Sequence, residues 1–433
     1  MRGCRTATLG SLVLMEPEYG SPQRSVPMES PGQVKYIRIT DFGDDGISFP
    51  HEFVTAEVVE SKYLLQQNDV LFARSGATAG KTFIYTKDLG TSIFAGYCIR
   101  FRFDPRKVAP WYVYFYTKTQ RFASWVRSMQ RPAGQPNINK EEFKSFRIPI
   151  VSPDLQASLV IDLLAARKAR DAAFAQARAL IDGIDDSVLA ELGVTRPTND
   201  RRLTFALPLR ELKARCDEGA TRLDPHYNAP RFSKLVRALR GTPSRSLGNL
   251  VRFSTDQCNP HDCTGDTFSY IEISGIDLQT GEVSAVKTQT TEAPSRARML
   301  VREGDILVSL TRPHRGAIGV VPKHLHGAIA STGFAVVREI IASDCRRDFL
   351  LAILRSSVCL QQMLQRSSGG NYPAITEHEL TLLTVPLPCY KVQKRIVAEI
   401  ADKQAHVRRI RTEAVGMWAA AMKRFEGKLL ARE

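Results

Sequence analysis

The sequence predicts an α+β protein in which two duplicated domains of mixed strands and helices are separated by two long helices, which we expect to pair as an antiparallel coiled coil. Three observations support this prediction. The chain repeats itself with a period of about 237 residues, the interval between Gln156 and Gln393. The front of each repeat contains short β-branched and aromatic runs bounded by Gly, Pro and Asn, which are typical of strands. Each repeat ends in a long amphipathic stretch that begins after a proline.

The duplication is visible as matching motifs that follow one another in the same order. Tyr36-Ile37-Arg38-Ile39 precedes Asp69-Val70-Leu71-Phe72 in the first half, and Tyr270-Ile271-Glu272-Ile273 precedes Asp305-Ile306-Leu307-Val308 in the second. Further pairs are Leu9-Gly10-Ser11-Leu12 with Leu247-Gly248-Asn249-Leu250, Gln135-Pro136-Asn137-Ile138 with Tyr372-Pro373-Ala374-Ile375, Ile148-Pro149 with Val385-Pro386, and Gln156 with Gln393. So many matches in one order indicate that the two halves share a fold.

Helical stretches follow the strands in each half. Apolar residues recur three or four apart from Trp111 to Met129 and from Arg347 to Leu364. A longer helix is then predicted from Pro153 to near Gly183, and another after Pro388. The apolar stripes of the two long helices are Leu155, Leu159, Leu163, Phe174 and Ile181, and Val392, Ile396, Ile400, Val407, Ile410, Ala414, Met417 and Phe425.

The spacing within these stripes is close to the 3.5 residues of paired helices, although Lys403 interrupts the second stripe. We therefore expect the two long helices to pack on each other. Two alternatives remain open: each helix could pack on the core of its own domain, or lie on a membrane surface through its basic face. The predicted division of the chain is a first domain at 1–150, a central helix at 151–195, a second domain at 196–387 and a C-terminal helix at 388–433.

Composition points to a nucleic-acid partner. The formal net charge is +15, from 60 Lys and Arg against 45 Asp and Glu, and a basic protein gains affinity for a polyanion by releasing its counterions. No apolar run approaches the roughly 20 residues that cross a bilayer. The stretch from Leu9 to Met15 lacks the cleavage site of a signal peptide. We therefore expect a cytoplasmic protein with no membrane partner, whose eight cysteines are mostly buried thiols, as at Cys98 and Cys359.

No catalytic or metal-binding motif is convincing. The segment from Ser75 to Thr82 resembles a phosphate-binding loop, but Ser75 stands where that motif needs glycine, and the following Phe83-Ile84-Tyr85 predicts a strand instead of a helix. Asp224-Pro225-His226-Tyr227 lacks the second proline of an adenine methyltransferase loop. Cys258, His261 and Cys263 have no second ligand pair at zinc-finger spacing. We expect no catalytic residue, metal or cofactor in this chain.

The chain resembles the specificity subunits of type I restriction-modification enzymes over essentially its whole length. The motifs that carry the resemblance are Asp69 to Gly76 with its second-half match Gly304 to Ser309, Gln135-Pro136-Asn137-Ile138, and the pattern of Ile148-Pro149, Pro153 and Gln156, repeated as Val385-Pro386, Pro388 and Gln393. One departure is an extra segment, Arg201 to Arg245, that only the second half has.

The resemblance implies two target-recognition domains, each reading one half of a bipartite site in double-stranded DNA. It further implies that the paired helices dock two modification subunits, which methylate adenine with S-adenosylmethionine, and that restriction (motor-nuclease) subunits complete the complex. Polar and basic residues of the glycine-rich loops are our candidates for DNA contact. These candidates are Arg74, Ser75, Thr78, Lys81, Arg131, Gln135 and Asn137 in the first half, and Thr311, Arg312, His314, Arg315, Asn371 and Tyr372 in the second.

Two other functions remain open from the sequence. The chain could be a DNA-targeting subunit of another phage-defence system, which neighbouring genes would decide. It could also be a degenerate methyltransferase with an unrecognised active site, which cofactor binding by the isolated chain would decide. The target sequence cannot be read from the residues, because no residue-to-base code exists for such domains.

Overall fold

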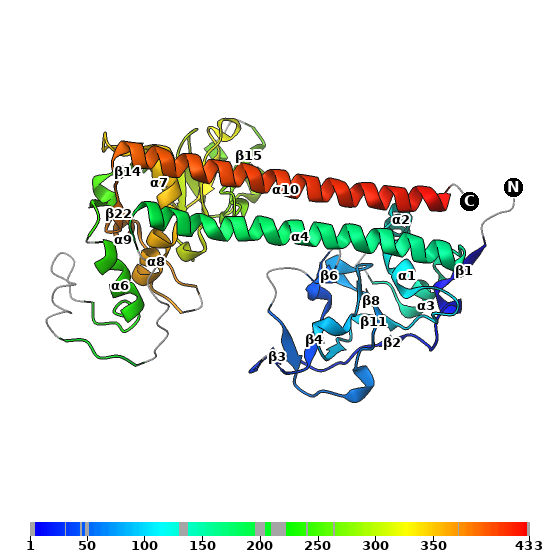
Figure 1. The fold of residues 1–433 in the computed structure, drawn as a ribbon. Helices are drawn as coiled ribbons and strands as arrows, with labels where there is room; N and C mark the ends of the chain where they lie inside the picture. Colours follow the sequence, from blue (N-terminus) through cyan, green and yellow to red (C-terminus); the bar gives the residue numbers. More distant parts are fainter. Residues whose placement is uncertain are drawn as a thin grey trace. The chain divides into compact units, whose positions relative to one another are not determined.

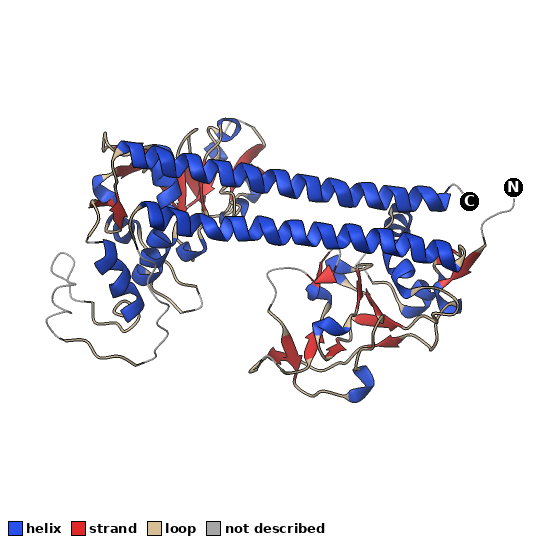
Figure 2. Ribbon diagram, in the orientation of Figure 1, coloured by secondary structure: helices blue, strands red, loops and turns tan. Residues whose placement is uncertain are grey.

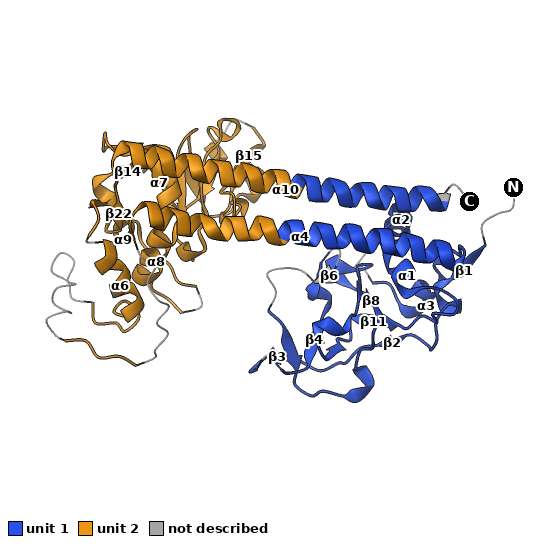
Figure 3. Cartoon of the chain, in the orientation of Figure 1, with its two compact units in different colours: residues 1–174, 412–433 blue, residues 175–411 orange. Residues whose placement is uncertain are grey.

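The computed structural model describes residues 5–30, 32–43, 46–47, 52–129, 137–194, 204–208, 222–239, 241–262, 265–370 and 372–430 (Figures 1 and 2). It divides into two compact units, coloured separately in Figure 3: unit 1 holds 1–174 and 412–433, and unit 2 holds 175–411. Each of two long helices contributes one segment to each unit. Among the described residues, no helix combines the length and apolar character needed to span a membrane.

Unit 1 is built around a four-stranded antiparallel sheet. Its strands run in the order β2 (Glu18–Tyr19), β11 (Cys98–Phe101), β8 (Val70–Ala73) and β9 (Thr82–Ile84). The strand predicted at Phe83-Ile84-Tyr85 is thereby confirmed at Phe83 and Ile84. Smaller pairings join β1 (Thr6–Thr8) to β12 (Arg147–Pro149), β4 (Lys35–Ile37) to β10 (Ser92–Phe94), β3 (Ser25–Pro27) to β7 (Val54–Ala56), and β5 (Phe42–Gly43) to β6 (Gly46–Ile47).

Unit 2 repeats this topology. Its sheet has the order β14 (Val251–Phe253), β21 (Phe334–Ile340), β18 (Ile306–Ser309) and β19 (Ile318–Val320), which matches the first sheet strand for strand. The pair β13 (Ser244–Ser246) and β22 (Thr384–Pro386) matches β1 and β12. A second sheet contains β16 (Val286–Gln289), β15 (Thr267–Ile271), β20 (Ile329–Ser331) and β17 (Ala297–Leu300), with β15 and β20 parallel as β4 and β10 are.

The predicted duplication extends to individual hydrogen bonds. Asp69, at the start of β8, accepts from the Arg102 guanidinium at 2.7 Å, and Asp305 accepts from Arg338 at the same distance. Both carboxylates are buried, so each needs such a partner. In the second of the paired Leu-Gly motifs, Gly248 packs closely on Thr381, because a Cβ at Gly248 would lie 2.9 Å from Thr381 Cβ.

The helical piece predicted after the strands is two helices in each half, not one. Trp111 to Met129 contains α1 (Pro110–Tyr116) and α2 (Gln120–Met129), and Arg347 to Leu364 contains α7 (Arg347–Leu354) and most of α8 (Ser357–Arg366). A hydroxyl bonds back to the preceding helix at each break: Thr117 Oγ1 donates to Tyr114 O at 2.6 Å, and Ser356 Oγ donates to Ile353 O at 2.7 Å. Such bonds compete with the helical pattern and favour helix ends.

A capped short helix then turns the chain toward each long helix. In α3 (Lys140–Ser145), Asn139 Oδ1 accepts from the Glu142 amide at 2.9 Å while Glu142 Oε2 accepts from the Asn139 amide at 2.7 Å. In α9 (Glu377–Thr381), Thr376 caps through a bond from the Glu379 amide.

The long helices begin where the prolines predict, as α4 (Pro153–Glu191) and α10 (Tyr390–Leu430). The predicted end near Gly183 was wrong, because Val188 and Leu189 beyond it pack in the core of unit 2 and carry the helix onward. The helix is terminated instead at Gly193, whose φ of +66° suits glycine and whose amide donates to Ala190 O at 3.0 Å.

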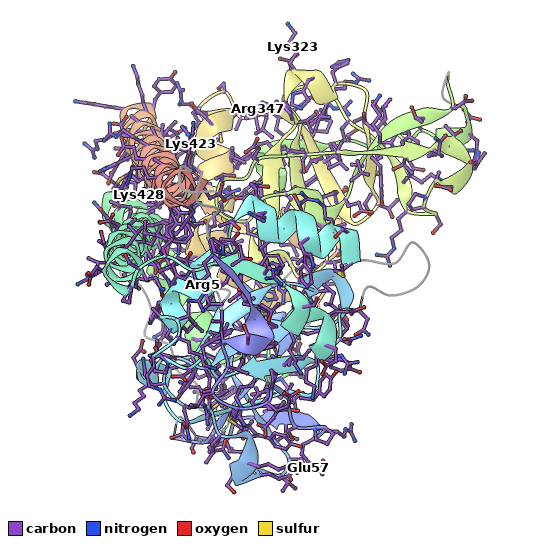
Figure 4. The ribbon with its side chains drawn as sticks, turned by 90° about the vertical axis from the view of Figure 1, so that its right-hand side faces the viewer. Arg5, Glu57, Lys323, Arg347, Lys423 and Lys428 are labelled. Atoms are coloured by element: carbon purple, nitrogen blue, oxygen red, sulfur yellow. The ribbon has the colours of Figure 1, made fainter. Side chains whose placement is uncertain are left out.

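Contacts inside each unit show that α4 and α10 pair antiparallel. In unit 1, Lys428 Nζ lies 3.4 Å from Asp162 Oδ2, as Figure 4 helps to locate, and the Arg170 guanidinium lies 4.8 Å from the Trp418 ring centroid. In unit 2, Lys403 bonds to Ser187 and Arg395 pairs with Glu191. Residue numbers increase along α4 while those of the contacting residues in α10 decrease, which is an antiparallel pairing. The predicted fold class and helix pairing are therefore confirmed.

The residues between the two halves include an element with no counterpart among the described residues of the first half. α6 (Pro230–Leu239) belongs to the extra segment predicted at Arg201 to Arg245, and it buries Phe232, Leu235 and Leu239. It lies against α8 and β22 of unit 2. The extra segment is therefore partly a packed helix of the second domain.

Candidate nucleic-acid interface

The glycine-rich loop of unit 1 follows β8 and returns as β9. The Ala73 amide donates to Lys81 O and the Gly80 amide donates to Ala73 O, both at 2.8 Å, so the loop closes on itself around the short 3₁₀ turn Gly76–Thr78. Gly80 has a φ of +87°, and a Cβ there would lie 2.5 Å from Val126 of α2. Glycine is needed for both the turn and this close approach.

Arg74 is fixed at the base of this loop by backbone and side-chain bonds. Its amide donates to Tyr97 O at 3.0 Å, and its carbonyl accepts from the Ile138 amide at 2.8 Å. Its Nε donates to Asn137 Oδ1 at 3.2 Å, and its guanidinium carbon lies 4.7 Å from the centroid of the Tyr19 ring. Tyr19 is 39% exposed and Tyr97 is 63% exposed, so both tyrosines that contact Arg74, one by its ring and one by its backbone, are open to solvent.

The loop of unit 2 is built on the same backbone bonds. The Leu310 amide donates to Gly333 O at 2.7 Å, and the Ile375 amide donates to Leu310 O at 2.9 Å. These bonds correspond to those of Arg74 in the first half. The bridge between Thr311 and Ala374 likewise corresponds to the one between Ser75 and Asn137. Each loop is therefore held to a second segment that comes more than 60 residues later.

In the glycine-rich loop of unit 2, an arginine also lies over a tyrosine ring. Arg312 lies 4.1 Å from the centroid of the Tyr372 ring, and Tyr372 is 67% exposed. The Arg312 backbone is left-handed, with φ of +49° and ψ of +48°, and its amide donates to Pro373 O at 2.7 Å. A left-handed residue other than Gly costs on the order of 1 kcal/mol, so the surrounding bonds hold this arginine against local strain.

His314 and Arg315 follow on the 3₁₀ turn Pro313–Arg315. His314 Nδ1 is buried without a hydrogen-bond partner among the described residues. Burial lowers the pKa of His314 below its usual value, and the neighbouring Arg315 and Arg312 lower it further. The ring is therefore held neutral beside two cations, of which Arg315 is exposed.

The structure brings together some of the predicted contact residues and leaves others apart. Arg74, Ser75 and Asn137 form one group, and Thr311, Arg312 and Tyr372 form the other. Thr78 donates to Ser75 O at 3.4 Å, and Lys81 joins the first loop through its carbonyl. Arg131, Gln135 and Asn371 lie outside the described residues. Sequence reasoning missed Tyr19, which is distant in sequence from the loop, and Tyr97.

The side chains of these loops carry cationic, hydrogen-bonding and aromatic groups. Guanidinium, amide, hydroxyl and aromatic groups match the donors, acceptors and faces of nucleic-acid bases and phosphates. Among the described residues, no group of three or more His, Cys, Asp or Glu could hold a metal ion. The predicted burial of Cys98 and Cys359 is confirmed, and burial raises the pKa of both thiols, that of Cys359 to about 12, so neither is a thiolate near neutral pH.

Comparison with known proteins gives a consistent result. Residues 20–160 match the model of the type I restriction modification DNA specificity domain. The specificity subunit of the type I restriction enzyme HindI from Haemophilus influenzae is 30% identical over 118 residues, which are 27% of this chain and 25% of that protein. The chain thus spans about a quarter of the length of this curated relative. The resemblance stated from the sequence is confirmed.

Solved structures were compared as well. A chain from a structure on the assembly and conformational transition of a type I R-M system is 18% identical, with coverage of 100% and 97% of the two chains and a TM-score of 0.45. The type I S subunit from M. genitalium is 13% identical, with coverage of 98% and 97% and a TM-score of 0.43. The HsdS subunit from Thermoanaerobacter tengcongensis is 18% identical, with coverage of 99% and 96% and a TM-score of 0.35.

Proposed function

We propose that this chain, which resembles type I specificity subunits, is the DNA-reading subunit of a type I restriction-modification complex. Residues 1–150 and 196–387 are then the two target-recognition domains, and 151–195 and 388–433 are the helices that join and space them. The observation that carries the proposal is that equivalent backbone bonds, at Arg74 and at Leu310, close the two glycine-rich loops. Each loop also carries an arginine, Arg74 or Arg312, over a tyrosine ring. Two copies of one reading device suit a target made of two half-sites.

The charge of the chain supports a DNA ligand. A net charge of +15 favours the phosphate backbone, which supplies affinity without sequence preference. Sequence preference must come from side chains that reach base edges, and the loop arginines with Asn137 and Thr311 have the hydrogen-bonding groups for it. The remaining predicted contacts, among them Thr78, Lys81, His314 and Arg315, would position the loops on phosphates.

The chemistry would lie in the partners. The described loops offer no nucleophile with an adjacent base, so methyl transfer from S-adenosylmethionine would belong to two modification subunits docked on this chain, and cleavage to restriction subunits. The paired helices α4 and α10 offer exposed apolar side chains, at Ile161 and Val415, that a docked partner would cover.

Reconstitution tests this function. Methylation of target DNA should require both this chain and the modification subunit, and the chain alone should transfer no methyl group. The assay measures incorporation of labelled methyl groups into target and scrambled DNA by each component and by the mixture. A matched variant, Arg74→Ala with Arg312→Ala, should keep assembly and lose the preference for target DNA.

Two outcomes would refute the proposal. One is methyl transfer by the purified chain alone, which would favour an unrecognised active site. The other is a mixture that methylates target and scrambled DNA equally, since the chain would then supply no sequence preference.

A further inference from the structure

In each unit, an arginine of the glycine-rich loop lies over an exposed tyrosine. The two arginines do not occupy equivalent positions, because the backbone bonds of Arg74 are repeated by Leu310. Arg74 lies on Tyr19 and Arg312 lies on Tyr372. The tyrosines come from unrelated positions: Tyr19 is on β2, and Tyr372 is in the turn between the bridged Ser368 and Ala374. The two units therefore place an arginine over a tyrosine from different positions of the duplicated fold.

Stacking has a specific consequence for an arginine. A guanidinium that lies over a ring is restricted by that contact, and the contact uses none of its N–H donors. In unit 1 the Nε donor is also used, by Asn137 Oδ1 at 3.2 Å. No hydrogen bond from the two Nη groups of Arg74 to another described residue is present. The outer pair of donors is thus oriented before any ligand arrives.

A fixed pair of parallel donors matches one base edge best. Guanine presents its O6 and N7 acceptors side by side in the major groove, and bidentate Arg to these atoms is the commonest specific contact. Adenine offers one acceptor and one donor there, so the same guanidinium would make one bond and meet one repulsion. A flexible arginine could turn away from this mismatch, whereas a stacked one cannot.

We infer that Tyr19 and Tyr372 are positioning residues that hold Arg74 and Arg312 to read one guanine in each half of the DNA target. This inference rests on the proposed function and deepens it, because it names a base for each unit. The left-handed backbone of Arg312, held by its bond to Pro373 O, serves the same end in unit 2. The tyrosine hydroxyls are not required for stacking, so the ring alone should suffice.

The test combines protein variants with 7-deazaguanine, which lacks only the N7 acceptor. The target is first read from the methylated positions in cells, and each of its guanines is then replaced singly in duplex DNA. Binding is measured for the complex of the full chain with its modification subunit. With the unaltered chain, one replacement in each half-site should weaken binding about tenfold, the loss of one good bond in a bidentate pair.

The variants show which residue reads which guanine. In Arg74→Ala the penalty for one guanine should disappear while the penalty in the other half-site persists, and Arg312→Ala should give the reverse. Tyr19→Leu and Tyr372→Leu should each reduce the penalty of their own arginine severalfold, and Tyr19→Phe and Tyr372→Phe should keep it. Lys81→Ala is the matched control in the first loop, and it should weaken all DNAs equally and leave both penalties intact.

The outcomes separate this inference from the function beneath it. A half-site without guanine, or penalties that do not respond to the arginine variants, would overturn the guanine assignment while leaving a sequence-specific subunit. Tyrosine variants that lower affinity but leave the deazaguanine penalty unchanged would overturn the positioning role, because a structural defect has that signature. An unaltered complex that does not distinguish target from scrambled DNA would instead refute the proposed function.

Discussion

At the scale of single residues, buried polar side chains explain why short motifs recur in the two halves. Gln156 Oε1 accepts from the Ala109 amide at 2.9 Å while its Nε2 donates to Val151 O at 2.9 Å. Gln393 makes the same pair of bonds, with the Arg346 amide at 3.0 Å and Pro388 O at 2.9 Å. Each glutamine thus ties the start of a long helix to the loop before α1 or α7, and a buried amide left without these partners would be costly.

His314 gives a prediction at the same scale. Its pKa is lowered by burial and by Arg315 and Arg312, so the unfolded chain binds this proton more readily than the folded chain. The folded state should therefore lose stability as the pH falls below about 6.5, the ordinary histidine value, toward the lower pKa of the folded state. His314→Asn should remove that part of the loss.

Urea unfolding of the full chain at pH 7.5 and pH 5.5, followed by a signal from unit 2, measures this difference. His324→Asn, at an exposed position of the same unit, controls for the removal of a histidine as such. If wild type and His314→Asn lose equal stability over this pH range, protonation of His314 does not destabilise the folded state.

At the scale of elements, the sequence predicted which segments are helices better than where they end. The prolines at 153 and 388 correctly predicted the starts. Pro153 is the first residue of α4, where no amide donor is needed, and Pro388 lies two residues before α10. Gly183 was misleading as a stop, since a helix continues through a glycine when residues beyond it pack, as Val188 does. Tertiary contact of this kind leaves no local signal in the sequence.

The buried faces of the two long helices differ from the predicted apolar stripes. Phe174 and Met417 belonged to the predicted stripes but are exposed, at 38% and 56%. The buried face of α4 instead follows a seven-residue interval through Leu163, Arg170 and Ala177, and that of α10 follows Val407, Ala414 and Ala421. Ala414 was part of the predicted stripe, whereas Arg170, Ala177 and Ala421 are not recognised as core residues from hydrophobicity alone, although their spacing is that of a coiled coil.

This seven-residue interval defines an insertion that keeps the pairing. Adding seven residues after Ala172 in α4 and seven after Val415 in α10 should preserve both buried faces and lengthen each helix by about 10 Å. If the helices set the distance between the half-sites, the unread spacer should grow by up to about three base pairs with the half-site letters unchanged. The methylated sites of cells carrying this chain provide the measurement.

A seven-residue insertion in α4 alone is the control. It leaves the two helices unequal, so it should impair assembly, whereas the double insertion should not. A double insertion that methylates sites with the original spacer would show that the helices do not set the spacing.

At the scale of the whole molecule, the duplication was the most informative sequence signal. It predicted that the two halves share a fold, which the matched sheets confirm, and it placed Arg74 and Asn137 in motifs that recur in the second half. It did not predict Tyr19, since an aromatic contact from a distant strand has no counterpart at the same place in the second half. Residues that differ between duplicated domains are the ones expected to distinguish two half-sites.

The central claim is that each unit reads its own half of a bipartite DNA target. The most direct measurement is methylome sequencing of cells that express the modification subunit with the unaltered chain, with Arg74→Ala or with Arg312→Ala. We predict two short blocks separated by unread base pairs, with Arg74→Ala relaxing a letter in one block and Arg312→Ala relaxing a letter in the other. A single continuous recognition word, or two variants that relax the same block, would contradict the claim.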